Sequence, residues 1–236
     1  MRVHMQREIE RLKQQVMALS AEVESDLRTA VRAFEDREPA LAQIVLDREA
    51  VTNAMEVDVE EECLKILALY QPVAADLRYI VAVLKINHDL ERIGDLGVHI
   101  AERGLFLSQK PKIEVPFPVG QMADRSQAML KKVLDAFANL DGAAALEVCA
   151  ADREVDEIHR EIFQRVKEAV TRNPQMFEPL LQILHISRFL ERIADHATNI
   201  AEDLIYLIEG RIVRHTPEVS DKGQTPGQPP NDRPTD

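Results

Sequence analysis

Two stretches of the chain carry apolar residues at uninterrupted steps of three and four. The first stretch contains Val83, Ile86, Leu90, Ile93, Gly97, Ile100, Gly104 and Leu107, and the second contains Ile183, Ile186, Leu190, Ile193, Ala197, Ile200, Leu204 and Leu207. This spacing draws one apolar seam along a helix and is typical of a helix packed against antiparallel neighbours in a bundle. The small residues Gly97 and Ala197 in these seams favour a close approach of the neighbouring helices.

The breakers between apolar segments predict three long helices in each half of the chain. We expect helices over about 3–34, 39–69, 72–108, 120–140, 142–172 and 176–209. Pro39 and Pro72 stand at two predicted helix starts, where a proline loses no needed hydrogen bond. The proline-rich segment 110–118 predicts a stiff connector, and the proline- and glycine-rich segment 214–236 predicts a disordered tail.

The two halves also repeat one sequence. Ten of the nineteen positions in 84–102 are identical in 184–202, and at an offset of 103 Glu49 and Asn53 correspond to Asp152 and Asp156. Self-similarity at a nearly fixed offset marks a duplicated structural unit. We therefore predict an all-α fold of two antiparallel three-helix bundles related by a pseudo-twofold. Their expected ranges are 1–109 and 119–213, with 110–118 as linker and 214–236 as tail.

Composition and charge favour a helical protein and argue against one that binds nucleic acid. The 236 residues include no Trp, only ten Phe and Tyr, and no glycine before Gly94, which favours long helices over a sheet. The formal net charge of −12 argues against nucleic acid as a partner and suits metal cations or a basic protein surface. Residues 1–13 carry no apolar export signal, so we expect a cytoplasmic protein.

Pairs of acidic or amide residues recur at steps of four, away from the apolar seams. They are Glu49 with Asn53, Glu91 with Asp95, Asp152 with Asp156, and Glu191 with Asp195. Stacked like charges are unfavourable by a few tenths of a kcal/mol, roughly, unless a cation lies between them. One pair from each of two adjacent helices predicts an oxygen-rich metal site on the outside of each bundle. With His99, His196 and Asn199 nearby, this ligand set favours Mg²⁺, Mn²⁺ or iron over a Cys/His zinc site.

An ordinary solvated helix face is the simpler interpretation of the same residues. Arg92 precedes Asp95 by three residues, Arg188 precedes Glu191 by three, and Arg192 precedes Asp195 by three. Local ion pairs at this spacing would explain the acidic pattern without a metal.

Two further alternatives give the chain a chemical activity. A ferritin-like di-iron oxidase needs Glu-x-x-His on helices that face the bundle core, and no Glu here is followed by His three residues later. A helical phosphotransfer module would use His88, because His88-Asp89-Leu90 is similar to a kinase phosphoacceptor box. Arg188 replaces His88 in the other repeat.

The chain resembles the PhoU family, the phosphate-signalling accessory proteins of bacteria, over residues 1 to about 213. The resemblance rests on the segments 91–95 and 191–195, on Gln71-Pro72-Val73-Ala74-Ala75-Asp76-Leu77-Arg78 and on Asn53-Ala54-Met55-Glu56. It implies surface metal clusters, often iron or zinc, held by the four pairs named above. His99 stands where relatives often have Asn, as at Asn199. Asn53 supplies a neutral oxygen, so we expect the first site to bind metal more weakly than the second.

The resemblance also implies a function. Proteins of this family are non-enzymatic negative regulators of phosphate uptake and of the phosphate-starvation response. The resemblance implies contacts with the ATPase of the phosphate ABC transporter and with a membrane sensor histidine kinase. We expect a homodimer that is peripheral to the membrane at most. The sequence agrees with the absence of catalysis, since it contains no P-loop and no GxSxG motif.

Overall fold

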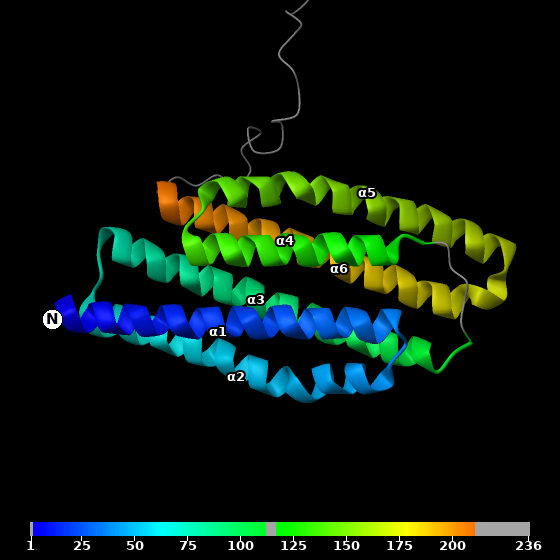
Figure 1. Ribbon diagram of the computed structural model, residues 1–236, viewed down its shortest axis with the longest axis horizontal. Helices are drawn as coiled ribbons and strands as arrows, with labels where there is room; N and C mark the ends of the chain where they lie inside the picture. The colour runs from blue at the N-terminus through cyan, green and yellow to red at the C-terminus, as the bar shows by residue number, and fades with distance from the viewer. Residues whose placement is uncertain (1, 112–116, 211–236) are drawn as a thin grey trace, which may run out of the picture.

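The computed structural model describes residues 2–111 and 117–210, and these residues are helical almost throughout (Figure 1). The helices are α1 (Arg2–Glu35), α2 (Pro39–Tyr70), α3 (Ala74–Ser108), α4 (Val119–Asn139), α5 (Gly142–Arg172) and α6 (Phe177–Glu209), with the 3₁₀ helix η1 (Pro174–Met176) before α6. No strand occurs in these ranges. The predicted all-α class is confirmed.

The helix ends follow the signals in the sequence, with one exception. Pro39 is the first residue of α2, and the Asp141 side chain caps α5 by accepting from the backbone N–H groups of Ala143 and Ala144 at 3.0 and 3.1 Å. The prediction that Pro72 opens the third helix is wrong, because α3 begins at Ala74. Val73 is extended and Ala74 has a φ of 53°, so the chain turns sharply before the helix starts.

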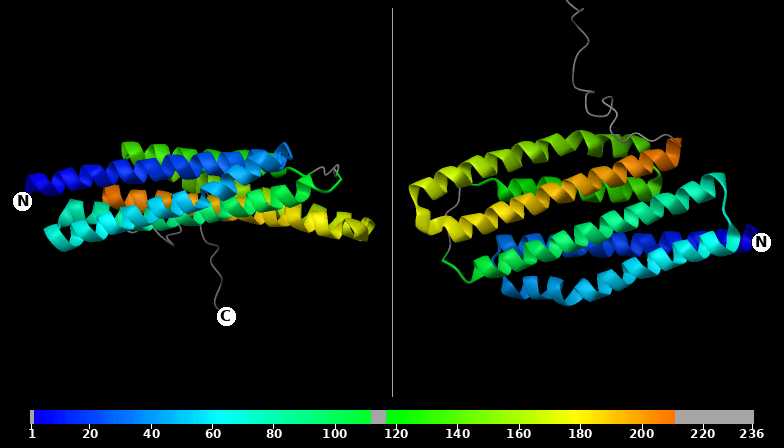
Figure 2. Two further views of the ribbon diagram at one scale, coloured as in Figure 1. Left: turned by 90° about the horizontal axis from the view of Figure 1, so that it is seen from below. Right: turned by 180° about the vertical axis from the view of Figure 1, so that it is seen from behind.

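The helices form two three-helix bundles, as predicted. Helices α1, α2 and α3 pack together, as do α4, α5 and α6, and α3 packs along α6 where the bundles meet. Seen from behind, α5, α6, α3 and α2 lie side by side in one layer, and α4 and α1 form a second layer (Figure 2). Each bundle thus contributes equivalent helices to each layer, which agrees with the predicted pseudo-twofold.

The apolar seams lie in the core of the molecule. All the predicted seam residues of α3 and α6 are buried except Leu207, which is half-buried. The buried apolar residues form one cluster that continues through both bundles, because α3 and α6 pack against each other. The domain boundaries at 109 and 119 stay predictions. Residues 112–116 of the linker and the tail over 214–236 lie outside the described residues.

Two glycines of α3 lie against the backbone of α1. A Cβ at Gly97 would lie 3.8 Å from the Cα of Leu27, which is an ordinary contact. A Cβ at Gly104 would lie 3.1 Å from the Cα of Phe34 and 3.2 Å from its N, which is too close for a backbone to accept without moving. The close approach predicted at Gly97 is present, and the tighter contact lies two turns further on, at Gly104.

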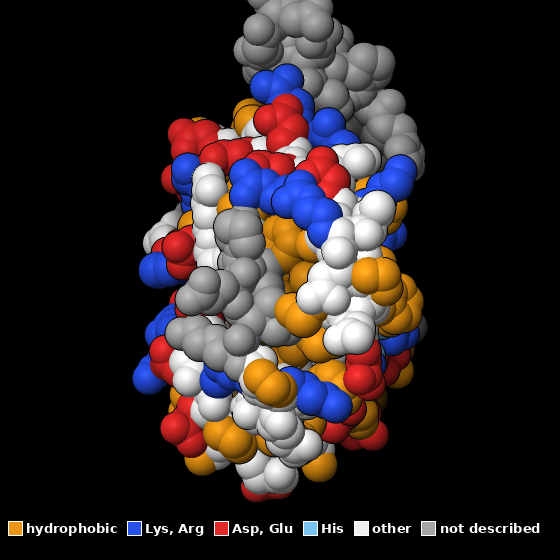
Figure 3. All heavy atoms as spheres, turned by 90° about the vertical axis from the view of Figure 1, so that its right-hand side faces the viewer, with side chains coloured by type: hydrophobic (Ala, Val, Ile, Leu, Met, Phe, Trp, Pro, Cys, Tyr) orange, Lys and Arg blue, Asp and Glu red, His pale blue; other side chains and the backbone are white. Residues whose placement is uncertain are grey.

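Apolar side chains outside the core gather at two places. Figure 3 shows hydrophobic side chains in the middle of the end where α6 begins, with charged side chains around them, and Phe177 is exposed there. The other place is α2, which carries Ile44, Val51, Val57, Leu64 and Leu69 as exposed side chains. No helix in the described part of the chain combines the length and the apolar character needed to cross a membrane.

Candidate metal-binding sites

The first candidate site lies between α2 and α3. We call it site 1, and its predicted ligands are Glu49, Asn53, Glu91 and Asp95. Two contacts fix the register of the helices: Asn87 Nδ2 donates to the carbonyl oxygen and to Oε1 of Glu56, both at 3.0 Å. Two turns further along α3, a Cβ at Gly94 would lie 3.9 Å from Thr52 Cγ2. Because Thr52 faces Gly94, the four predicted ligands lie on adjoining surfaces of the two helices.

An arginine contacts both acids of α3 in site 1. Arg92 Nε lies 3.1 Å from Glu91 Oε2, and Arg92 Nη1 donates to Asp95 Oδ2 at 3.3 Å. His88 Nδ1 lies 3.8 Å from the same oxygen of Glu91, and its ring is mostly exposed. Glu91 Oε2 is buried and accepts no hydrogen bond from the described residues. Site 1 therefore holds an acidic pair that Arg92 partly neutralises, and Glu91 Oε2 has an ion-pair contact but no hydrogen bond within the described residues.

The second candidate site lies between α5 and α6. We call it site 2, and its predicted ligands are Asp152, Asp156, Glu191 and Asp195. His159 Nδ1 lies 3.1 Å from the Oγ of Ser187 and joins the two helices beside this site. Arg188 donates to Glu191, as the simpler interpretation predicted. Of the other predicted local pairs, Arg92 with Asp95 is present, whereas Arg192 forms no ion pair with Asp195 in the described structure.

The carboxylates of site 2 repel one another. Burial raises the pKa of Asp152 to about 6, and the negative charges of Asp195, Asp156 and Glu191 add to the shift. Burial, followed by the charge of Asp156, also raises the pKa of Asp195. The predicted ligands from α5 and α6 are therefore close enough for their charges to interact. When all of them are ionised, their repulsion lowers the stability of the folded state.

The residues of site 2 fit a cation that prefers oxygen ligands. As the side chains stand, no three His, Cys, Asp or Glu side chains in the described ranges converge closely enough to hold a metal ion. A cation at site 2 would relieve the repulsion that raises the pKa of Asp152, and carboxylates are ligands for Mg²⁺, Mn²⁺ and iron. Site 1 fits less well, because Asn53 is neutral and Arg92 already contacts two carboxylates.

Each site has one further residue that the sequence interpretation missed. Glu56 on α2 lies beside site 1. Burial is the main cause of its raised pKa, and the negative charge of Glu91 adds to the shift. His159 on α5 feels the charges of Glu191 and Asp156 beside site 2, and burial lowers its pKa. Both lie three residues after the second ligand of their helix, at the offset of 103. The steps of four and three along one helix face were the signal that could have identified them.

The structure engages His99, His196 and Asn199 in the contact between α3 and α6. Asp89 Oδ1 lies 2.8 Å from His196 Nδ1 and accepts a hydrogen bond from Asn199 Nδ2 at 3.3 Å, so these residues join α3 to α6. The ring of His99 packs 5.4 Å from that of Phe189, measured between centroids. These side chains serve the contact between the bundles and are not grouped with the predicted ligands.

Comparison with known proteins identifies the family. The model of the PhoU domain matches residues 5–104 and 119–204, one match in each bundle. The chain belongs to the PhoU family. It is 37% identical to the phosphate-specific transport system accessory protein PhoU homolog of Pseudomonas aeruginosa, over 88% of this chain and 86% of that protein. It is 34% identical to PhoU homolog 1 of Thermotoga maritima, over 89% and 90% of the two chains.

Solved PhoU structures share the fold. The crystal structure of PhoU from Pseudomonas aeruginosa superposes with a TM-score of 0.84 at 36% identity, covering 87% of this chain and 99% of that one. The phosphate transport system regulatory protein PhoU from Streptococcus pneumoniae gives a TM-score of 0.79 at 27% identity, covering 89% and 99%. The resemblance found in the sequence is confirmed.

Proposed function

We propose that this protein is an accessory regulator of a phosphate-specific transport system, and that it represses phosphate uptake and the phosphate-starvation response. The observation that carries the proposal is the match of the PhoU domain to both bundles, over residues 5–104 and 119–204. The relatives from Pseudomonas and Thermotoga are named as accessory proteins of this transport system. We propose no catalysed reaction, since an accessory regulator acts by binding.

We propose two protein partners, the ATPase of the phosphate ABC transporter and the sensor histidine kinase of the phosphate two-component system. The formal net charge of −12 supports docking on basic protein surfaces and disfavours nucleic acid. The protein would act in the cytoplasm as a homodimer that is peripheral to the membrane at most.

We propose metal ions at site 2 and, with lower affinity, at site 1. Family resemblance favours iron or zinc, and the oxygen ligands are also compatible with Mg²⁺ or Mn²⁺. A bound cation supplies positive charge that stabilises ionised carboxylates. Asp152 and Asp156 would bind it from α5, and Glu191 and Asp195 from α6, so that these residues hold the two helices together. The charges of Asp195, Asp156 and Glu191, which add to the burial that raises the pKa of Asp152, support the proposal because a bound cation would offset them.

Deletion of the gene in its host tests the proposed function. We expect phosphate uptake and a starvation-response reporter to stay active in phosphate-rich medium, and the wild-type gene to restore repression. Pull-downs with the transporter ATPase and the sensory domain of the kinase should retain the protein at low salt. Retention should fall as salt shortens the Debye length below about 10 Å, its value at about 0.1 M. Normal repression in the deletion strain, with neither partner retained, would refute the proposal.

A further inference from the structure

Helices α2 and α5 occupy equivalent positions in the two bundles, and their buried residues correspond. At the offset of 103 the buried residues Ala42, Val45, Thr52, Val59 and Cys63 of α2 match the buried residues Ala145, Val148, Val155, Ile162 and Val166 of α5. The alignment therefore holds along most of the two helices. It allows each outward-facing residue of α2 to be compared with its counterpart in α5.

At four outward-facing positions α2 is apolar where α5 is charged, and Phe163 of α5, 47% exposed with Glu60 as its counterpart, is the reverse case. Ile44, Val51, Val57 and Leu64 are between 45% and 55% exposed on α2. Their counterparts on α5 are Glu147, Glu154, Arg160 and Lys167, all exposed. The exposed Ala54 has Glu157 as its counterpart. Because α5 forms the same helix with charged residues at these positions, the bundle does not need apolar side chains there.

Exposed apolar residues recur along one side of α2, and we call them the α2 track. Its members are Ile44, Val51, Ala54, Val57 and Leu64, at steps of seven, three, three and seven residues. Steps of three join neighbouring turns, and steps of seven return to nearly the same side of the helix two turns further on. At 1.5 Å per residue the track is about 30 Å long. A track this long and narrow matches one helical segment laid along α2, a recognised mode of peptide binding.

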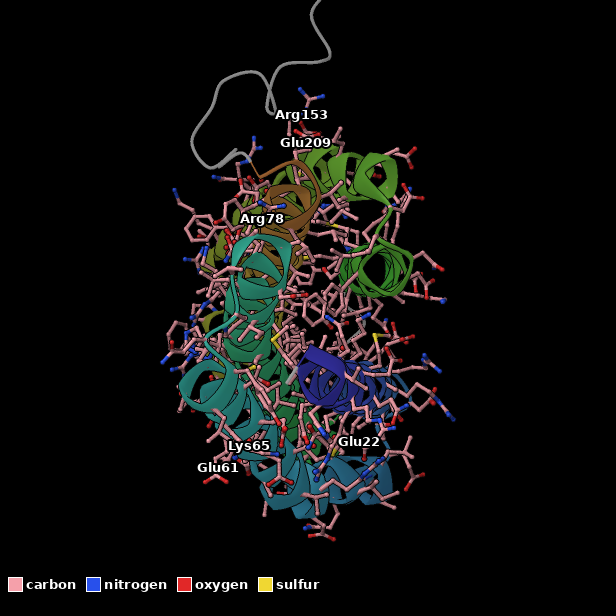
Figure 4. All side chains as sticks on the ribbon, turned by 90° about the vertical axis from the view of Figure 1, so that its left-hand side faces the viewer. Glu22, Glu61, Lys65, Arg78, Arg153 and Glu209 are labelled. Carbon is pink, nitrogen blue, oxygen red and sulfur yellow. The ribbon has the colours of Figure 1, made fainter. Side chains whose placement is uncertain are left out.

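Unpaired carboxylates lie beside the α2 track and, at Glu60 and Glu61, between its members Val57 and Leu64. Asp58, Glu60 and Glu61 are exposed, and none of them forms an ion pair with a described residue. Figure 4 shows Glu61 pointing away from the bundle, whereas Lys65 contacts Glu8 of α1 at 3.0 Å and Glu62 at 2.9 Å. On α5, by contrast, exposed acids are paired, as in Glu154 with Arg125 and Glu168 with Arg172. The charge around the α2 track is therefore negative and available to a partner.

We propose that the α2 track is a docking surface for a cationic amphipathic helix of a partner protein. The inference rests on the proposed function in that the protein acts by binding partners, and it names the surface and the chemistry of one of them. Apolar residues of the partner would cover Val57 and Leu64, and its lysines or arginines would face Asp58, Glu60 and Glu61. A second copy of α2 would bring like charges together, and an anionic lipid surface would be repelled.

A synthetic peptide provides the test. The probe is a fluorescein-labelled helix of leucine and lysine with leucine at every third or fourth position, and its control is the same composition in scrambled order. In fluorescence anisotropy the full-length wild type should bind the probe, more weakly at higher salt. V57R/L64K, which installs the residues found in α5, should bind about tenfold more weakly or worse, and so should the uncharged V57Q/L64Q. Circular dichroism should show an unchanged helical signal for both.

A matched variant separates the apolar contact from the added charge. A150R/Q164K places two positive charges on exposed positions of α5 and should bind the probe as the wild type does. Equal binding by wild type and V57R/L64K, or no binding by wild type, would overturn the proposal. So would a wild-type dimer that V57R/L64K dissociates in sedimentation equilibrium, since that result would assign the track to a second copy.

The deletion strain distinguishes this inference from the proposed function. If the wild-type gene fails to restore repression of the phosphate reporter, the proposed function is wrong. If the wild type restores repression and V57R/L64K restores it equally well, the docking surface is wrong while the proposed function stands. We expect the wild type and A150R/Q164K to restore repression, and V57R/L64K to lose it.

Discussion

The helix pair α5 and α6 carries its acids differently from the equivalent pair α2 and α3. In α5 and α6 four carboxylates lie close together, and the pKa of Asp152 rises to about 6. In α2 and α3 Asn53 replaces one carboxylate, and Arg92 contacts Glu91 and Asp95. Most buried positions are shared between α2 and α5 and between α3 and α6, so packing does not require this difference. The comparison teaches that the duplicated bundle fixes where the acids stand, while neighbouring charges decide which site favours a cation.

Removing the acids of site 2 should have the largest effect. We expect D152A/D156A, and separately E191A/D195A, to abolish metal binding at site 2 and to keep the helical content, because these side chains lie outside the apolar core. Metal analysis of protein purified without chelator or a nickel column, beside circular dichroism, measures both. The control E154A/E157A removes two acids from the exposed side of α5 and should retain the metal. Unchanged stoichiometry, or metal loss together with unfolding, would contradict the assignment.

The first bundle packs α3 closely against α1 through Gly97 and Gly104, whereas the second bundle has Ala197 at the position of Gly97. Gly104→Ala should lower the free energy of unfolding by about 1–3 kcal/mol, because its Cβ would press on the backbone of Phe34. Gly97→Ala should be neutral or should raise the free energy of unfolding by up to about 1 kcal/mol, since alanine favours helix and Ala197 stands at that position in the second bundle. Urea unfolding of the two variants gives the comparison. Equal stabilities would show that α1 and α3 are not held this closely.

The pH dependence of the stability of the metal-free protein should report the burial of Asp152 and its repulsion by the other carboxylates of site 2. The folded pKa of Asp152, about 6, lies above its ordinary value of 3.8, so the folded state binds the proton more tightly. Stability should therefore be highest below about pH 4 for this group and should fall as pH rises through 6, by about 1–3 kcal/mol. Asp152→Asn should remove that fall. Glu49→Gln, the same change at the exposed counterpart in α2, is the control. If the stability of D152N fell more steeply with pH than that of the wild type, Asp152 would stabilise the folded state as pH rises, which is the opposite of the expected sign and would refute the account.

Arg92 should give the smallest effect. It forms exposed ion pairs, so Arg92→Gln should change the free energy of unfolding by less than about 1 kcal/mol. The same change frees Glu91 and Asp95 and should raise the metal affinity of site 1. Isothermal titration with Mn²⁺ measures the affinity, and thermal unfolding measures the stability. Weaker binding in R92Q would show that Arg92 does not compete with the metal.

The sequence predicted most helices because their signals are local. The seam from Val83 to Leu107 identified α3, and Pro39 and Asp141 marked the starts of α2 and α5 within a residue. It misplaced the start of α3, because nothing in the residues around Pro72 signals a positive φ at Ala74. It also identified the acidic pairs, whose spacing depends only on helix geometry.

The contact between the bundles could not be predicted from the sequence. His196 and Asn199 looked like neighbours of the metal ligands, because they follow Asp195 on the same helix. They bond instead to Asp89 across the boundary between α3 and α6. Such a contact depends on how two distant helices are oriented, and no local spacing records it. Glu56 and His159 could have been found, since they continue the helix faces of the predicted ligands.

One titration can test whether site 2 binds a cation more tightly than site 1. Mn²⁺ added to metal-free protein broadens NMR signals near the bound ion. The account predicts that substoichiometric Mn²⁺ broadens signals around Asp156 and Asp195 first, and signals around Asn53 and Asp95 only at higher concentrations. Simultaneous broadening of both regions, or earlier broadening of the region between α2 and α3, would contradict it.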